Sequence, residues 1–178
     1  KYNSSRDDAP PCYEAYFTPE DEPCESTDGY YARKMEYTGP QLNLLISETF
    51  LDAYDKHDVS ASLGAHRVRY AYNKNLLQTS VQYYDKDDVP FKCYRGYASM
   101  YREYNENRSL LWAVYYDAEG NPVSTGGRYA AQVHRYDLSG NHTAEKYFST
   151  DRQPVIQSEG YASVHYEYDH EGNITSVS

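Results

Sequence analysis

The stretch that decides the fold reads Tyr115-Tyr116-Asp117-Ala118-Glu119-Gly120-Asn121-Pro122-Val123. A related stretch, Tyr147-Phe148-Ser149-Thr150-Asp151-Arg152-Gln153-Pro154-Val155, follows at an offset of 32 residues (147 − 115). The pair Tyr129-Ala130 returns at the same offset as Tyr161-Ala162. Self-similarity at a fixed period of this size is typical of proteins built from tandem repeats. The sequence therefore predicts an array of small units, each of which contacts mainly its neighbours.

The same pattern extends toward the N-terminus. One period earlier, Tyr83-Tyr84-Asp85 and Tyr97-Ala98 occupy the corresponding positions. The segment from Tyr16 to Cys24 matches the opening stretch at an offset of 99 (115 − 16). After it, Gly29-Tyr30-Tyr31-Ala32 aligns with residues 127–130. Before it, Tyr2-Asn3 is similar to the later Tyr-Asp pairs. We therefore predict a single repeat array over residues 1–178. Its expected units are 1–28 (partial), 29–63, 64–95, 96–127, 128–159 and 160–178 (partial).

Each unit has the pattern of two strands joined by turns. In the first run, Tyr129–Tyr136, apolar residues such as Ala130 alternate with charged ones such as Arg135, which predicts a strand with one buried face. The turn 137–141 follows, with the Asp, Gly and Asn residues that such turns favour. The run Thr143–Phe148 is then expected to be the return strand, and a second turn leads to the next unit. No window has a helical period, so the fold class is all-β.

Two packings of these strands fit the pattern. Short strands that alternate with two turn signals per unit favour an elongated ribbon or superhelix of β-hairpins. The alternative is a β-solenoid, in which each strand lies parallel to its counterpart one repeat away. In some units the turn glycine is replaced by Asp21, Asp88 or Asn107, residue types that tolerate a positive φ.

Composition excludes several classes of function. The chain has 23 tyrosines and a formal net charge of −10, and nucleic-acid binding requires a basic surface instead. No apolar run approaches the roughly 20 residues that cross a bilayer, so no transmembrane segment is expected in this region. Because the chain begins with Lys1 and ends within a repeat, we expect it to be a segment of a longer protein. Among the three cysteines, Cys12–Cys24 is the pair that proximity favours, although small apolar residues at repeat positions explain the cysteines better.

The residues that carry chemistry do not form a catalytic pattern. The six histidines do not recur at a fixed position of the repeat, and no nucleophile elbow, phosphate loop or zinc motif is present. Turns such as 137–141 and 169–173 resemble the start of a calcium loop but lack its full length and its terminal Glu. We therefore predict a non-enzymatic protein with no metal site and no cofactor.

The Tyr-Tyr-Asp-Ala-Glu-Gly-Asn-Pro-Val box at 115–123 and the Gly-Tyr-Ala box at 160–162 carry a resemblance. The chain resembles the Tyr-Asp-rich tandem repeats of bacterial surface and secreted proteins, including a Firmicutes type. It is more distantly similar to the YD repeats of Rhs proteins and to glucan- and choline-binding hairpin repeats. The resemblance covers nearly the whole chain and implies an extracellular or cell-surface location.

A row of tyrosines is the best candidate for a ligand-binding surface. Tyr97, Tyr129 and Tyr161 recur at one position, by alternation on the polar face of the first strand, and Trp112 is the single tryptophan. Exposed aromatic rows can stack against sugar rings, so the first hypothesis is a spacer or surface-binding module for cell-wall or host polysaccharide. The second hypothesis is a self-associating structural array (a stalk, filament or shell) in which the rings form the core. The third is an accessory region of a larger cell-surface enzyme.

Overall fold

The computed structural model describes residues 10–39 and 43–178. The expected repeat element at Tyr2-Asn3 lies outside these ranges. Within them the regular secondary structure is entirely β, in agreement with the predicted fold class, and no helix there is long and apolar enough to cross a membrane. The strands are β1 (Tyr13–Ala15), β2 (Ala32–Tyr37), β3 (Leu45–Leu51), β4 (Arg67–Tyr72), β5 (Gln78–Tyr84), β6 (Ser99–Tyr104), β7 (Leu110–Tyr116), β8 (Ala131–Tyr136), β9 (His142–Phe148), β10 (Ser163–Tyr168) and β11 (Ile174–Val177).

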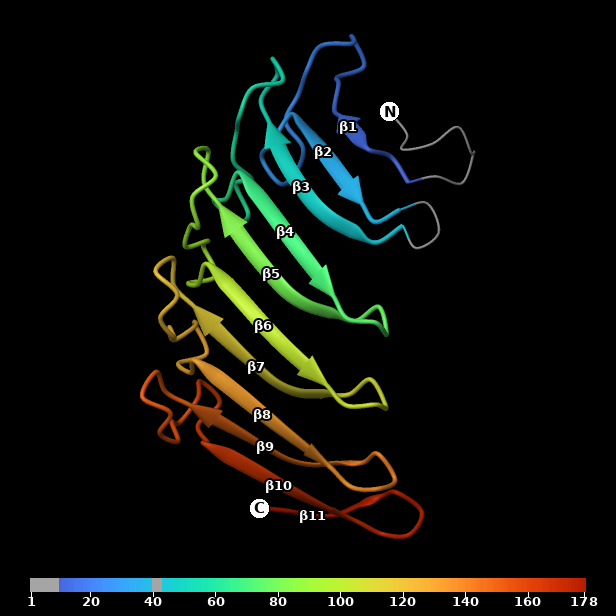
Figure 1. Ribbon diagram of the computed structural model, residues 1–178, viewed down its shortest axis with the longest axis vertical. Coiled ribbons are helices and arrows are strands. Elements are labelled where there is room, and N and C mark those ends of the chain that lie inside the picture. Colours follow the sequence, from blue (N-terminus) through green and yellow to red (C-terminus); the bar gives the residue numbers. More distant parts are fainter. Residues whose placement is uncertain (1–9, 40–42) are drawn as a thin grey trace. The chain divides into compact units, whose positions relative to one another are not determined.

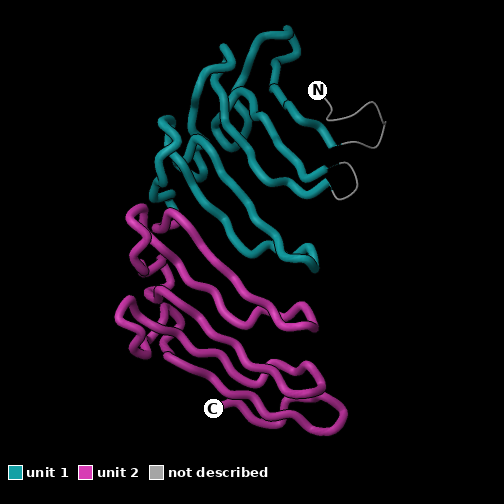
Figure 2. The backbone as a smooth tube through the Cα atoms, in the orientation of Figure 1, with its two compact units in different colours: residues 1–94 teal, residues 95–178 magenta. Residues whose placement is uncertain are grey.

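The chain forms two compact units, residues Lys1–Tyr94 and Arg95–Ser178 (Figure 2). Unit 1 contains β1 to β5, and unit 2 contains β6 to β11. Within each unit every strand pairs antiparallel with the strand that follows it in the sequence (Figure 1). The expected hairpin array is therefore confirmed. A solenoid would instead place the strands parallel to their counterparts, and it is not the arrangement found.

The turns of both units share one set of backbone hydrogen bonds. In the turn 137–141, for example, Asp137 N donates to Asn141 O over 3.0 Å, and Gly140 N donates back to Asp137 O over 3.1 Å. This geometry places the fourth turn residue at positive φ. Asp21 and Asp88 have the expected positive φ, but Asn107 does not, because the turn opens at Asn105 and its fourth residue is Arg108 (φ 68°).

Each long hairpin carries a β-bulge beside the turn that joins its strands. In the β8–β9 hairpin, Arg135 pairs with Ala144 and Tyr136 pairs with His142, so Thr143 is the extra residue. A bulge shifts the alternation of the return strand by one residue. His142 therefore projects from the same face of the sheet as residues 145 and 147, which strict alternation would not allow.

The chain enters each hairpin through a residue with positive φ. The residues are Gly29, Gly64, Gly96, Arg128 and Gly160. Each is the first residue of one of the units expected from the sequence. Tyr30 follows Gly29 just as Tyr129 follows Arg128, and Tyr31 N donates to Leu51 O as Ala130 N donates to Phe148 O. The expected match of Tyr31 to Tyr129 was thus wrong by one residue, because the backbone register places Tyr30 there.

Candidate functional site

A continuous ladder of tyrosine rings runs through unit 2. It alternates residues that precede the first strand of a hairpin with residues of the return strand. The ring centroids lie 4.9 Å apart for Tyr97–Tyr115, 6.0 Å for Tyr115–Tyr129, 4.7 Å for Tyr129–Tyr147 and 6.0 Å for Tyr147–Tyr161. These separations, with tilted or edge-to-face ring planes, are those of favourable aromatic pairs. The rings therefore connect one hairpin to the next.

Unit 1 contains a shorter form of the same ladder. The ring centroids of Tyr16 and Tyr30 are 6.0 Å apart, and those of Tyr30 and Phe50 are 4.8 Å apart. The next position of the series is Ala65, which has no ring, and its neighbour His66 stacks on His57 at 4.3 Å. The ladder is thus a property of the repeat that individual units can lose.

The structure brings the three tyrosines predicted as ligand residues together with Tyr115 and Tyr147. Tyr97 is only 6% exposed, and Tyr129 and Tyr161 are half-buried. They lie on the side of the buried return-strand tyrosines rather than on the polar face. The reason is that β8 starts at Ala131 and the residue before Tyr129 has positive φ, so the alternation of the strand does not extend to that ring. A ligand-binding role for these residues stays a prediction.

Trp112 lies apart from this ladder. It alternates with the buried residues Ala113 and Tyr115 on β7, so it projects from the opposite face. Its Nε1 donates a hydrogen bond to Glu103 Oε2 over 2.6 Å. On this opposite face, towards the ends of β7 and β9, a hollow of about 300 Å³ is lined in part by Tyr116, Phe148 and Arg152.

The surroundings of several ladder tyrosines raise the pKa of their hydroxyl groups. Burial raises the pKa of Tyr115 and of Tyr147 well above the ordinary value for tyrosine. The pKa of Tyr161 rises to about 12, chiefly because its hydroxyl donates a hydrogen bond of 2.8 Å to Glu145 Oε1. Neutral rings in van der Waals contact are suited to packing.

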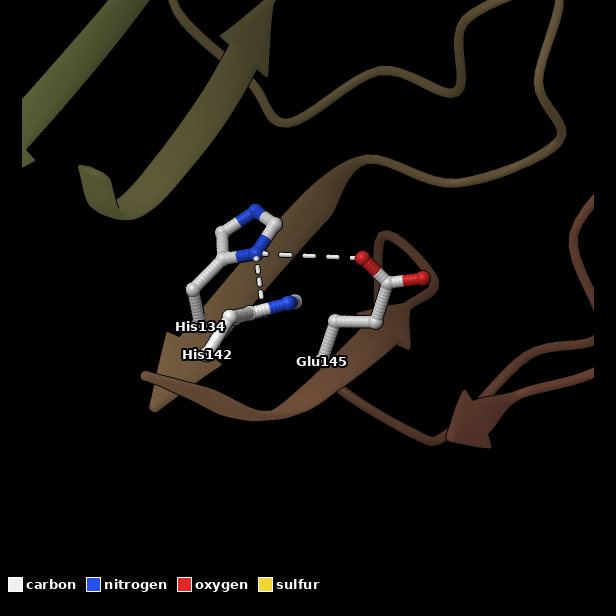
Figure 3. Close-up of side chains that lie close together, drawn as sticks. All are labelled: His134, His142 and Glu145. Carbon is white, nitrogen blue, oxygen red and sulfur yellow. Dashed lines mark hydrogen bonds and ion pairs between the residues drawn. The ribbon is translucent and has the colours of Figure 1, made fainter. Parts of the chain in front are cut away.

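Glu145 belongs to a cluster of three metal-ligating side chains on the β8–β9 hairpin (Figure 3). His134 on β8 pairs directly across the strands with Glu145 on β9, and the bulge brings His142 to the same face. His134 Nδ1 lies 3.0 Å from His142 Nε2 and 3.8 Å from Glu145 Oε2. The side chains of His134 and Glu145 are each 14% exposed, so the cluster is largely screened from solvent.

The electrostatics of the cluster favour a neutral His134. Burial lowers the pKa of His134, and the neighbouring His142 lowers it further, whereas Glu145 acts in the opposite sense. Its other ring nitrogen, Nε2, is buried and has no hydrogen-bond partner among the described residues. A neutral imidazole leaves one ring nitrogen with a lone pair, which is the form that binds metal ions.

Unit 1 carries a carboxylate at the position equivalent to Glu145. Glu48 pairs with Met35 and Val68, as Glu145 pairs with His134 and Val164. Glu48 is 8% exposed and accepts a hydrogen bond from the hydroxyl group of Tyr70. Its Oε2 atom lies 3.2 Å from Arg33 Nη1. The guanidinium group is shared with Glu14, whose Oε2 atom lies 2.9 Å from Arg33 Nε, so it places a positive charge beside both acids.

The histidine cluster was not predicted from the sequence. The prediction required ligating histidines to recur at one position of the repeat, whereas this cluster occurs in a single hairpin. The signal that could have revealed it is local: His134, His142 and Glu145 flank one turn at positions that face each other across a bulged hairpin. The bulge itself cannot be read from the sequence pattern.

Other sequence expectations concern the turns and the cysteines. The carboxylates of Asp137 and Asp169 accept the backbone N–H groups of Asn141 and Asn173, each over 2.9 Å. Hydrogen bonds from the side chains of these asparagines lower the pKa of both aspartates. The turn-forming role expected for these residues is thus present. Cys12, Cys24 and Cys93 are free, so the structure has no Cys12–Cys24 disulfide.

No protein-family model matches the chain, and no curated protein matches it. A solved structure described as "Crystal Structure of TcdB2-TccC3-Cdc42" contains a chain with 11% sequence identity and a TM-score of 0.41. The match covers 93% of this chain but 9% of that one. No family is established by a likeness of this extent.

Proposed function

We propose that this chain is a non-enzymatic structural array that acts as a spacer, in which tyrosine rows hold successive hairpins together. The observation that carries the proposal is the interleaved ladder of unit 2. Tyr97, Tyr115 and Tyr147 are each at most 9% exposed, so their ring faces are covered by neighbouring residues. A sugar ring stacks only on an aromatic face that it can reach.

The acidic composition supports this role. A net charge of −10 keeps an array of sheet-forming units soluble and disfavours non-specific association. The proposed location is extracellular or at a cell surface, and it is based on the resemblance of the repeats to those of bacterial surface proteins.

A glycan array, combined with stability measurements, tests the proposal. The wild-type chain, Tyr129→Ala and Tyr129→Phe are compared. Tyr129→Phe retains the ring and removes only the hydroxyl group, so it serves as the matched control. We expect no glycan binding by any of the three proteins. We also expect Tyr129→Ala to lower the free energy of unfolding by about 2–4 kcal/mol, because a half-buried ring is lost from the ladder, and Tyr129→Phe to have a much smaller effect.

Two results would contradict the proposal. One is specific glycan binding by the wild type that disappears in a folded Tyr129→Ala variant, which would make the ladder a carbohydrate site. The other is an unchanged stability of Tyr129→Ala, since a ring that joins hairpins cannot be removed without cost.

A further inference from the structure

We propose that His134, His142 and Glu145 bind a divalent transition-metal ion, with Zn²⁺ as the ion that best suits the donor set. The inference is independent of whether the array is a spacer, because it concerns one hairpin. Two imidazole nitrogens and one carboxylate oxygen are a common set of protein ligands for a zinc ion that keeps a further position for water.

Two of the distances among the donor atoms are close to those that a zinc ion requires. Zinc lies about 2.0–2.2 Å from nitrogen and oxygen ligands, so neighbouring ligands of a tetrahedral ion are about 3.4 Å apart. The separations of 3.0 Å from His134 Nδ1 to His142 Nε2 and of 3.8 Å from His134 Nδ1 to Glu145 Oε2 bracket this value. One ligand atom from each of the three residues lies within 4.8 Å of the other two. Small rotations of the side chains would complete the site.

The three residues depart together from the residues of the preceding hairpin. At the same offset of 32 residues, His134, His142 and Glu145 replace Arg102, Leu110 and Ala113. The two hairpins have the same register and the same bulge, so these positions face each other in both. A glutamate at the Glu145 position also occurs in unit 1 as Glu48, but there it faces Met35 instead of a histidine. The two histidines are therefore what distinguishes the β8–β9 hairpin.

The negative charge of Glu145 also favours a bound cation. Its counterpart Glu48 lies beside the guanidinium group of Arg33, which also pairs with Glu14 and which stands opposite Phe50. In the β8–β9 hairpin the residue at that position is Gln132, which pairs with Tyr147 and is neutral. A divalent cation would supply the positive charge that the guanidinium group provides in unit 1.

The surroundings define what such an ion would do. The rings of Tyr136 on β8 and Tyr166 on β10 lie 5.3 and 5.6 Å from the ring of His142. They flank this histidine on the sides of both neighbouring strands. With Nδ1 bound to the ion, His134 carries its proton on the buried Nε2, for which the described residues provide none of the acceptors that usually support a metal-bound histidine. We therefore expect weaker binding than at a closed structural zinc site, and a role in fastening β8 to β9.

Calorimetric titration of Zn²⁺ into the metal-free chain tests the inference. The protein carries Cys12→Ser and Cys24→Ser, which remove two half-buried thiols that could bind zinc. The test variants are His142→Leu and Glu145→Ala, because Leu110 and Ala113 occupy these positions in the preceding hairpin and the fold accepts them there. His170→Gln removes a histidine that is 90% exposed in a turn, and it is the matched control.

We expect one Zn²⁺ per chain, with affinity reduced at least about tenfold in His142→Leu and in Glu145→Ala, and unchanged in His170→Gln. Zn²⁺ should also raise the melting temperature of the parent chain and of His170→Gln but not of His142→Leu, because an ion that binds only the folded state stabilises it. Absence of zinc binding by the parent chain would overturn the inference. Binding that His142→Leu leaves unchanged, or that His170→Gln removes, would place the ion elsewhere and would equally overturn it.

Discussion

At the scale of single residues, His66 shows how the repeat accommodates a polar side chain in its interior. The residue is 1% exposed, its Nδ1 atom lies 2.7 Å from the carbonyl oxygen of Asp58, and its Nε2 atom is buried without a described partner. Because Nδ1 faces a carbonyl group, it carries the proton and donates it, which leaves Nε2 with a lone pair. Protonation of Nε2 would place an uncompensated charge in the interior.

This arrangement predicts a stability that depends on pH. Burial lowers the pKa of His66 below the value of about 6.5 expected for an unfolded chain, and nearby His57, Arg67 and Lys86 lower it further, although the hydrogen bond to Asp58 opposes them. The unfolded state therefore binds the proton first, so the contribution of His66 is complete above about pH 6.5 and is lost as the pH falls toward the folded-state pKa.

The measurement compares the free energy of unfolding of the wild type and His66→Asn between pH 7.5 and 5. Asparagine keeps an N–H donor for Asp58 but does not titrate. The stability difference between the two proteins should shrink as the pH falls. A His66→Asn difference that stays constant or grows would show that His66 does not titrate in the predicted direction.

At the scale of structural elements, the turn before each hairpin contains one position with positive φ, and the space around that position decides which residues fit there. Gly29 has φ +73°, and a Cβ atom at this position would lie 2.3 Å from the Cβ atom of Ala61. Gly96 occupies the equivalent position with φ +95°, and a Cβ atom there would meet nothing within 4 Å. Arg128 shows that a side chain is accepted at this position when space allows.

Substitution of these two glycines should therefore have unequal effects. Gly96→Ala should cost about 1–2 kcal/mol of stability, the usual cost of the left-handed conformation for a residue with a Cβ atom. Gly29→Ala should cost distinctly more, because the contact with Ala61 adds to it. Urea unfolding followed by circular dichroism measures both, and addition of Ala61→Gly to Gly29→Ala should recover the excess. Equal costs, or no recovery, would mean that the contact with Ala61 is not the cause.

Sequence reasoning succeeded for elements that follow from local pattern. The period of 32, the alternation in β8 and the Asp-Gly-Asn turns together predicted an all-β hairpin array. It failed where one residue changes direction. The positive φ of Arg128 and the start of β8 at Ala131 turn Tyr129 toward the ladder, and the bulge at Thr143 turns His142 toward Glu145. Neither feature has a reliable sequence signal, so the exposure of the tyrosines and the histidine cluster could not be predicted.

At the scale of the whole molecule, the ring positions recur in part in unit 1 and without a gap from Tyr97 to Tyr161 in unit 2, where they connect one hairpin to the next. A lone hairpin is marginally stable in water, and a repeat protein gains its stability from the interfaces between neighbours. In unit 2 the alternating rings from Tyr97 to Tyr161 contribute to that interface, together with the backbone pairing of β7 with β8 and of β9 with β10. Loss of one ring should therefore destabilise hairpins beyond its own.

Urea unfolding monitored by the fluorescence of Trp112 tests this claim most directly. Trp112 is the single tryptophan and lies on β7, whereas Tyr147 lies on β9 of the next hairpin. Tyr147→Ala should lower the free energy of unfolding reported by Trp112 by about 3 kcal/mol or more, as expected for the loss of a buried aromatic side chain. Leu138→Ala, which removes a fully exposed apolar side chain from the β8–β9 turn, should leave it unchanged. If Tyr147→Ala leaves the Trp112 transition where it is in the wild type, the ladder does not couple the hairpins, and the account of this protein as a ring-linked array is contradicted.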